Sequence, residues 1–193
     1  MTEKQAHELV RTYPEFELRR YPAHVVAEVV VRAPFEDAGN RAFRTLAGYI
    51  GGQNRSRARI AMTAPVVQQE SERIAMTSPV VQRESGQGEY AVAFVLPARF
   101  TLEDAPVPTN PDVTLHARPA VLSAVRRYRG RWAQASFERH RAVLDRALGE
   151  AGLTPVGPPR WVRFDPPLVP APLRRNEVVQ DVSGQAGAPV RPS

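Results

Sequence analysis

Residues 24–54 read HVVAEVVVRAPFEDAGNRAFRTLAGYIGGQN and combine a strand pattern with a helix pattern. The stretch from His24 to Val31 is rich in β-branched residues, which is typical of a strand. From Phe35 onward, apolar residues recur at steps of three and four, which predicts an amphipathic helix. Pro34 suits the start of this helix and Gly51–Gly52 suit its end. Because the helix is apolar on one side only, we expect it to lie against a sheet.

The rest of the chain continues this alternation of strands and helices. Residues 132–153, WAQASFERHRAVLDRALGEAGL, carry a second one-sided helical pattern that stops near Gly152. Strands are expected in the segments rich in β-formers, namely 16–21, 23–31, 90–97, 113–119, 121–130, 161–165 and 176–182. The order strand, strand, helix, strand, strand occurs once before Pro97 and again after it. The sequence therefore predicts an α+β protein with antiparallel strands, built from two similar ββαββ halves.

Composition narrows the classes of function. The chain has 193 residues, no cysteine and a net charge of +6, and Lys4 is its only lysine among 26 basic residues. The absence of cysteine excludes disulfides, zinc–thiolate sites and cysteine nucleophiles. The arginines are spread along the chain without interleaved aromatic residues, so no nucleic-acid partner is expected. No apolar run approaches the length of a membrane span, and the expected location is cytoplasmic.

No catalytic signature is present, and no enzymatic activity is expected. GQGEYA, residues 86–91, matches a loose dinucleotide-binding pattern, but it precedes a strand and is expected to be a hairpin turn. The histidines are scattered without the spacing of metal ligands: His7, His24, His116 and His140. The carboxylates do not form an acid–base pair in sequence either. These residues suggest a binding module and leave its ligand open.

One short segment of the chain is written twice. Residues 59–86 read RIAMTAPVVQQESERIAMTSPVVQRESG, and the two copies differ only at Ala64/Ser78, Gln69/Arg83 and Glu72/Gly86. Both copies suit extended strands, with Pro65 and Pro79 at a bulge or sheet edge. We expect a longer β excursion in which only one of Met62 and Met76 faces the core.

Five blocks of the chain read YPEFELRRYPAHVVAEV, FRTLAGYIGGQN, RIAMTAPV, YAVAFVLP and FDPPLVPAPLRRNEV. Together, in this order and spacing over roughly residues 13–182, they resemble the SOUL haem-binding protein family. The resemblance implies a distorted eight-stranded antiparallel β-barrel with two flanking helices. It also implies reversible binding of haem or another porphyrin in a shallow apolar groove, beside the first helix and the loop before RRNEV. Which copy of the doubled segment occupies the family strand stays open.

The resemblance also implies site residues. Alignment on YIGG places the family's helix positions on Asn40, Phe43, Ala47 and Gly48, and a family position in the loop after DPP falls near Val169. The basic residues of the family are missing at these positions, and Arg41 and Arg44 on the helix, or Arg174 and Arg175 after the loop, are the candidates to bind acidic side groups in their place.

The expected cofactor-binding residues are Asn40, Phe43, Arg44, Ala47, Leu168, Val169 and Arg174. Some relatives carry a histidine where this chain has Arg20. His24 lies four residues further on, which is the same strand face if the strand is unbroken there, and it is the candidate metal ligand. The block from Arg174 to Glu177 suits a structural role through hydrogen bonds and ion pairs, with ligand contact as the alternative.

The expected organisation is an N-terminal extension (1–12), a SOUL-like domain (13–182, with halves at about 13–97 and 111–182) and a disordered tail (183–193). The expected function is a soluble haem- or tetrapyrrole-binding protein that acts as a carrier, buffer or sensor, with a monomer favoured. The alternative is a binding domain for other apolar or cationic small molecules, resembling the effector-binding domains of multidrug-sensing regulators.

Overall fold

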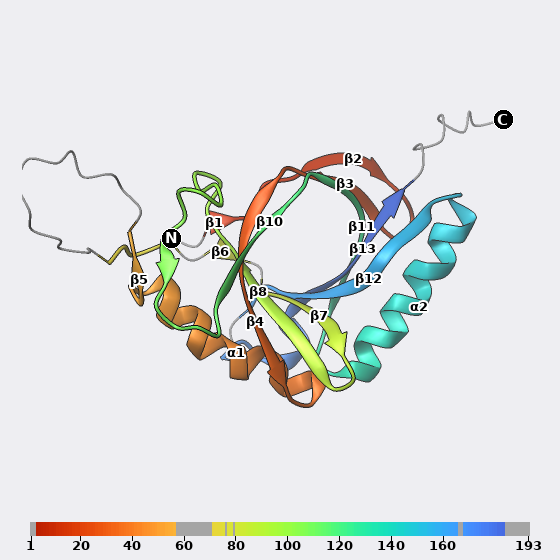
Figure 1. The fold of residues 1–193 in the computed structure, drawn as a ribbon. Coiled ribbons are helices and arrows are strands. Elements are labelled where there is room, and N and C mark those ends of the chain that lie inside the picture. The colour runs from red at the N-terminus through yellow and green to blue at the C-terminus, as the bar shows by residue number, and fades with distance from the viewer. Residues whose placement is uncertain (1–2, 57–70, 76, 79, 166–167, 184–193) are drawn as a thin grey trace, which may run out of the picture. The chain divides into compact units, whose positions relative to one another are not determined.

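A computed structural model of the chain describes residues 3–56, 71–75, 77–78, 80–165 and 168–183 (Figure 1). The chain forms two compact units. Unit 1 comprises residues 1–6 and 23–119, and unit 2 comprises residues 7–22 and 120–193. The N-terminal residues are thus divided, since residues 1–6 belong to unit 1 and residues 7–22 to unit 2.

Unit 1 places one helix against an antiparallel run of strands. The strands are β4 (His24–Arg32), β7 (Val80–Gly86), β8 (Glu89–Val95) and β10 (Thr114–Arg118), in the order β10-β4-β8-β7. Helix α1 (Phe35–Ile50) packs along β4 and β8 (Figure 1). Two small ladders complete the unit: β1 (Glu3–Lys4) with β6 (Thr77–Ser78), and β5 (Asn54–Arg55) with β9 (Val107–Pro108).

The core of unit 1 follows from the period-two pattern of its strands. Val25, Ala27 and Val29 of β4 pack in one cluster with Leu46 and Tyr49 of α1. Alternate residues of β4 therefore point to the face that α1 covers, and the residues between them point to the other face. Every apolar side chain in this cluster is at least nine-tenths buried, which holds α1 in place against the sheet.

Unit 2 has the same kind of layering. Its strands are β2 (Glu8–Thr12), β3 (Glu17–Tyr21), β11 (Val121–Arg129), β12 (Thr154–Arg163) and β13 (Arg175–Ser183), in the order β12-β13-β11-β3-β2. Helix α2 (Gln134–Glu150) packs against β11, β12 and β13 through Phe137, Leu144 and Leu148 (Figure 1). The short helix η1 (Ala171–Leu173) precedes β13.

The α+β class, the two helices and the antiparallel pairing of the large sheet are confirmed, although the short β1–β6 ladder is parallel, and the predicted closed barrel is wrong. Strands β10 and β2 each have a neighbour on one side only in the part of the chain that is described, so the sheet is open. Both are five residues long and largely solvent-accessible, and β2 carries a register shift between Leu9 and Arg11. Short, bulged and polar strands are the usual way to end a sheet without inviting further pairing.

Other predictions have mixed outcomes. GQGEYA forms the turn between β7 and β8, with Gly88 at φ 72°, as expected for a hairpin. The similarity of the two halves and the domain boundaries remain predictions. Most of the first copy of the doubled segment, with Met62, lies outside the described residues, as do Met76 and residues 184–193 of the expected tail.

Candidate functional site

One flank of α1 carries the four helix residues of the predicted cofactor site. Asn40, Phe43, Arg44 and Ala47 are spaced at three, four and seven residues, so they share this flank. Asn40 and Arg44 are exposed, and Ala47 is half-buried. Phe43 keeps 42% of its surface exposed, although the opposite side of α1 is fully packed. The flank therefore offers an accessible apolar surface with a polar border.

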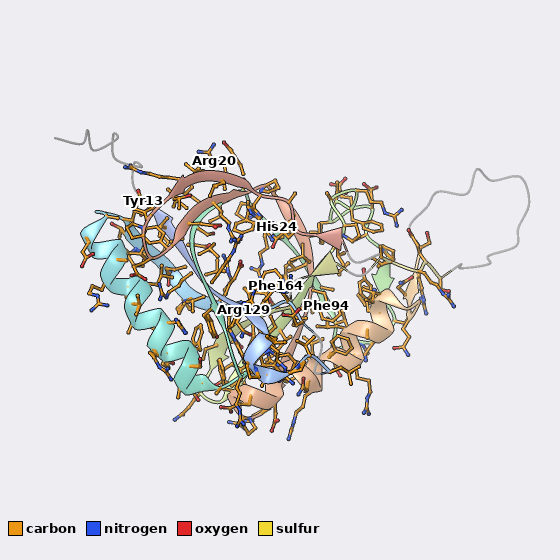
Figure 2. All side chains as sticks on the ribbon, turned by 180° about the vertical axis from the view of Figure 1, so that it is seen from behind. Tyr13, Arg20, His24, Phe94, Arg129 and Phe164 are labelled. Carbon is orange, nitrogen blue, oxygen red and sulfur yellow. The ribbon has the colours of Figure 1, made fainter. Side chains whose placement is uncertain are left out.

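The Phe43 ring is held in place by the sheet below it. Its centroid lies 5.5 Å from that of Phe94 on β8, with the rings at 65° to each other. Phe94 is only 2% exposed and belongs to the core of unit 1 (Figure 2 labels it). An edge-to-face contact of this kind fixes a ring without covering it. Phe43 thus presents a rigid aromatic face to solvent.

His24 does not lie on the α1 side of the sheet. Its neighbour Val25 packs against α1, whereas Val26 packs in a separate cluster with Ala93 and Val95. Because strand residues alternate, His24 shares the face of Val26, opposite α1 (Figure 2). The His24 Nε2 atom lies 3.3 Å from Nε2 of Gln5. The structure therefore does not bring the candidate metal ligand together with the α1 flank.

The remaining predicted site residues lie in unit 2. Leu168 is 94% exposed, and Val169 is half-buried. Arg174 Nε donates a 2.7 Å hydrogen bond to the carbonyl oxygen of Val169, and the Arg174 guanidinium lies 4.2 Å from the Trp132 ring centroid. Arg174 thus holds the start of this loop against the indole.

Trp132 belongs to a stack of alternating indoles and guanidiniums. Arg163 lies 4.8 Å from the Trp132 ring and 4.0 Å from the Trp161 ring, and it is only 5% exposed. Cation–π contacts stabilise most when they are shielded from water. The sequence contains both tryptophans and both arginines but no local sign of this stack, because its members come from three separate segments: Trp132, strand β12 and Arg174.

The RRNEV block makes internal hydrogen bonds throughout. Asn176, fully buried, donates through Nδ2 to the carbonyl oxygens of Gly130 and Arg174 at 3.2 and 3.3 Å. Arg175 pairs with Asp165 at 2.6 Å. Hydrogen bonds from Arg175 hold the pKa of the Asp165 carboxyl below its ordinary value.

Glu177 in the same block pairs with a buried arginine. The Arg19 guanidinium is 2% exposed and donates two hydrogen bonds to Glu177, at 3.0 and 3.2 Å. Burial alone would lower the pKa of Arg19, but the Glu177 carboxylate outweighs it and raises that pKa. A second buried carboxylate, Glu28 in unit 1, accepts hydrogen bonds from Arg83 and Arg118. These ionic groups are satisfied within the fold, which favours a structural role.

A hollow in unit 1 was not predicted from the sequence. It measures about 410 Å³ and is lined by Arg73, Ala75, Pro97, Ala98 and Arg99. Two of its lining residues come from the second copy of the doubled segment.

No group of three or more histidine, aspartate or glutamate side chains that could hold a metal ion occurs in the described ranges. No helix within those ranges has the length and apolarity needed to cross a bilayer.

The segment that lines one side of this hollow is anchored by Asn54. The buried Asn54 side chain donates to the carbonyl oxygens of Tyr49 and Glu72 at 2.7 and 2.8 Å, and it accepts from the Glu72 N–H at 2.8 Å. The N–H of Ile74 donates to the Ile50 carbonyl oxygen at 2.8 Å. These bonds attach residues 71–75 to the end of α1.

The fold is an open antiparallel sheet with one helix packed on each unit, and α1 has an accessible aromatic flank. The sequence profile described as "SOUL heme-binding protein" matches residues 2–181. The chain belongs to the SOUL heme-binding protein family. It is 30% identical over 168 residues to "Heme-binding protein 1" of Xenopus tropicalis, covering 84% of this chain and 81% of that protein. It is 27% identical over 164 residues to the protein of the same name in Xenopus laevis.

Solved structures extend the likeness of fold. The C-terminal domain of EcmrR superposes with a TM-score of 0.59 at 10% identity, covering 88% of this chain and 97% of that domain. A structure titled as a hydrolase from Listeria innocua has a TM-score of 0.55 at 13% identity, covering 89% and 94%. At these identities the likeness concerns the fold alone.

Proposed function

We propose that this protein binds haem or a related tetrapyrrole on the flank of α1, as a carrier, buffer or sensor. The observation that carries the proposal is the rigid, half-exposed ring of Phe43 on α1, in a chain of the SOUL heme-binding protein family. A porphyrin has two large apolar faces, and an aromatic residue with a small neighbour such as Ala47 provides a flat surface for one of them.

The residues on this flank suit contact with the porphyrin macrocycle better than ligation of the haem iron. Asn40, Phe43 and Ala47 offer an amide and apolar surface, and both histidines of unit 1 lie elsewhere. His24 and His116 share the face opposite α1, because their strand neighbours Val25 and Leu115 pack with the α1 cluster. Haem iron would supply its own redox and ligand chemistry when bound, while the chain binds and orients the macrocycle. Axial ligation by His24 is not part of this proposal. The contribution of Leu168, Val169 and Arg174 stays a prediction.

A haemin titration tests the proposal. We expect a shifted Soret band that saturates at one haemin per chain, and we expect His24→Ala to give the same titration curve. No saturable spectral change at micromolar haemin would overturn haem binding. Loss of binding in His24→Ala would place the ligand on the opposite face of the sheet.

A thermal-shift panel separates this function from a binding domain for other small molecules. A ligand that binds only the folded chain raises its melting temperature by mass action. We expect porphyrins to raise the melting temperature and hydrophobic cations to leave it unchanged. Stabilisation by the cations alone would favour the alternative.

A further inference from the structure

The hollow beside α1 carries two cationic side chains and an apolar floor. Arg73 and Arg99 line it together with Ala75, Pro97 and Ala98. The Arg99 side chain is 61% exposed, and Arg73 is exposed as well. Guanidinium groups recognise carboxylates through paired N–H donors, so this combination suits an acidic group at the edge of an apolar molecule.

The direction of α1 leads from the Phe43 flank to this hollow. Phe35 contacts Tyr90 at 5.8 Å between ring centroids, and Phe43 contacts Phe94 at 5.5 Å, so α1 and β8 run in the same direction. The distance along α1 from Phe35 to Phe43 and the distance along β8 from Tyr90 to Phe94 are both about 12–13 Å. The next seven helix residues, to Ile50, span about 10 Å, as do the three strand residues from Phe94 to Pro97. The end of α1 therefore lies level with Pro97.

Hydrogen bonding at the end of α1 agrees with this geometry. Ile50 accepts a hydrogen bond from Ile74, whose neighbours Arg73 and Ala75 both line the hollow. Phe43, Ala47 and Ile50 lie on one line along the helix at steps of four and three. The residues that line the hollow thus lie next to the end of α1, about 10 Å along the helix axis from Phe43.

We propose that the hollow of Arg73 and Arg99 binds the carboxylate side groups of a tetrapyrrole whose face lies on Phe43 and Ala47. This inference rests on the proposed function and identifies its ligand class as an acidic porphyrin. The arginines expected from the sequence to bind the acidic groups are placed differently. Arg44 lies along the flank itself, and Arg174 is bonded to Val169 and stacked on Trp132 in unit 2.

Glu72 gives the hollow an internal competitor. Its carboxylate accepts a 3.0 Å hydrogen bond from Nη2 of Arg99. A bound carboxylate would share or replace this partner, and it would experience repulsion from Glu72. The Glu72 backbone is fixed by Asn54 independently of its side chain, so the charge can be removed without releasing the segment. Removal of this charge should therefore strengthen the binding of acidic porphyrins.

Titrations with a free-base dicarboxylate porphyrin and with its neutral diamide test the proposal. We expect Arg73→Gln and Arg99→Gln each to weaken binding of the dicarboxylate about tenfold and to leave the diamide unaffected. Glu72→Gln should tighten binding of the dicarboxylate severalfold. Arg32→Gln is the matched control, because Arg32 is an exposed arginine before the start of α1, at the other end of the helix.

The outcomes separate the two proposals. If neither porphyrin binds the wild type, the proposed function fails. If Arg73→Gln and Arg99→Gln bind the dicarboxylate porphyrin as tightly as the wild type does, and their urea midpoints are unchanged, the assignment of the hollow fails. An effect confined to Arg44→Gln would place the carboxylates on the helix and also overturn it. Equal losses in Arg32→Gln would reduce the effect to net charge, which contradicts a specific site.

Discussion

Truncation of Phe43 to alanine tests the aromatic flank directly. Phe43 is 42% exposed, and a phenylalanine side chain has an area of about 200 Å², so about 80 Å² is open to a ligand. At about 25 cal/mol per Å², covering that area contributes about 2 kcal/mol, or about 30-fold in Kd. We therefore expect Phe43→Ala to weaken haemin binding by about 10- to 30-fold.

The cost to the fold should be smaller than the full burial of the ring would suggest. Phe43 is outside the buried cluster of α1, and its ring contacts the core at Phe94. Complete core truncations of phenylalanine cost about 3–5 kcal/mol, and alanine is the better helix former. We expect Phe43→Ala to lower the free energy of unfolding by about 1–2 kcal/mol in urea titrations.

Val30→Ala is the matched control for this measurement. Val30 is 53% exposed on β4, and its neighbour Val29 belongs to the α1 cluster, so Val30 lies on the opposite face of the same strand. We expect its haemin affinity to equal that of the wild type. Equal affinities for Phe43→Ala and the wild type, with both proteins folded, would refute binding at the flank.

Three further substitutions probe the stability of the two units. Glu177→Gln leaves the buried Arg19 with less compensation and should cost about 2–3 kcal/mol of unfolding free energy in urea; an unchanged midpoint would contradict this. Burial, then the nearby arginines, lower the pKa of His140, so on acidification below about 6.5 the unfolded chain takes up a proton before the folded one. The free energy of unfolding should therefore fall as the pH is lowered from 7.5 to 5.5, with the slope that one titrating group produces. His140→Gln should flatten this pH dependence in thermal melts. Asn54→Ala removes three hydrogen bonds and should cost about 2–3 kcal/mol, and it should weaken binding of acidic porphyrins more than of their neutral amides.

Local patterns predicted the elements of this fold well. The three- and four-residue period from Phe35 gave a helix that ends at Ile50 beside Gly51, and the β-branched run before it gave β4. These features depend on residues close in sequence. Closure of the sheet depends instead on whether the edge strands pair, and no local pattern encodes that choice.

The candidate site residues depend on both kinds of information. Arg20 and His24 belong to different strands, since β3 ends at Tyr21 and β4 begins at His24, as the separate strand patterns at 16–21 and 23–31 predict. Arg174 contacts Trp132, which is 42 residues away in sequence, and no local pattern indicates that contact. Helical spacing places Asn40, Phe43 and Ala47 on one flank, but their assignment to a cofactor site came from the family resemblance and stays a prediction.

The position of the histidines leads to a last prediction, about the metal. In the proposed site, Phe43 contacts the porphyrin face, and Arg73 and Arg99 bind its acidic groups. Iron adds to the affinity of such a site only if a side chain of the protein reaches the metal. His24 and His116 lie on the face opposite α1. We therefore expect haemin and the free-base porphyrin with the same side groups to bind within about threefold of each other, as measured by fluorescence quenching of Trp132 and Trp161 and by absorbance. A preference for haemin of more than about thirtyfold would require an iron ligand from this chain and would contradict recognition by the ring and its carboxylates.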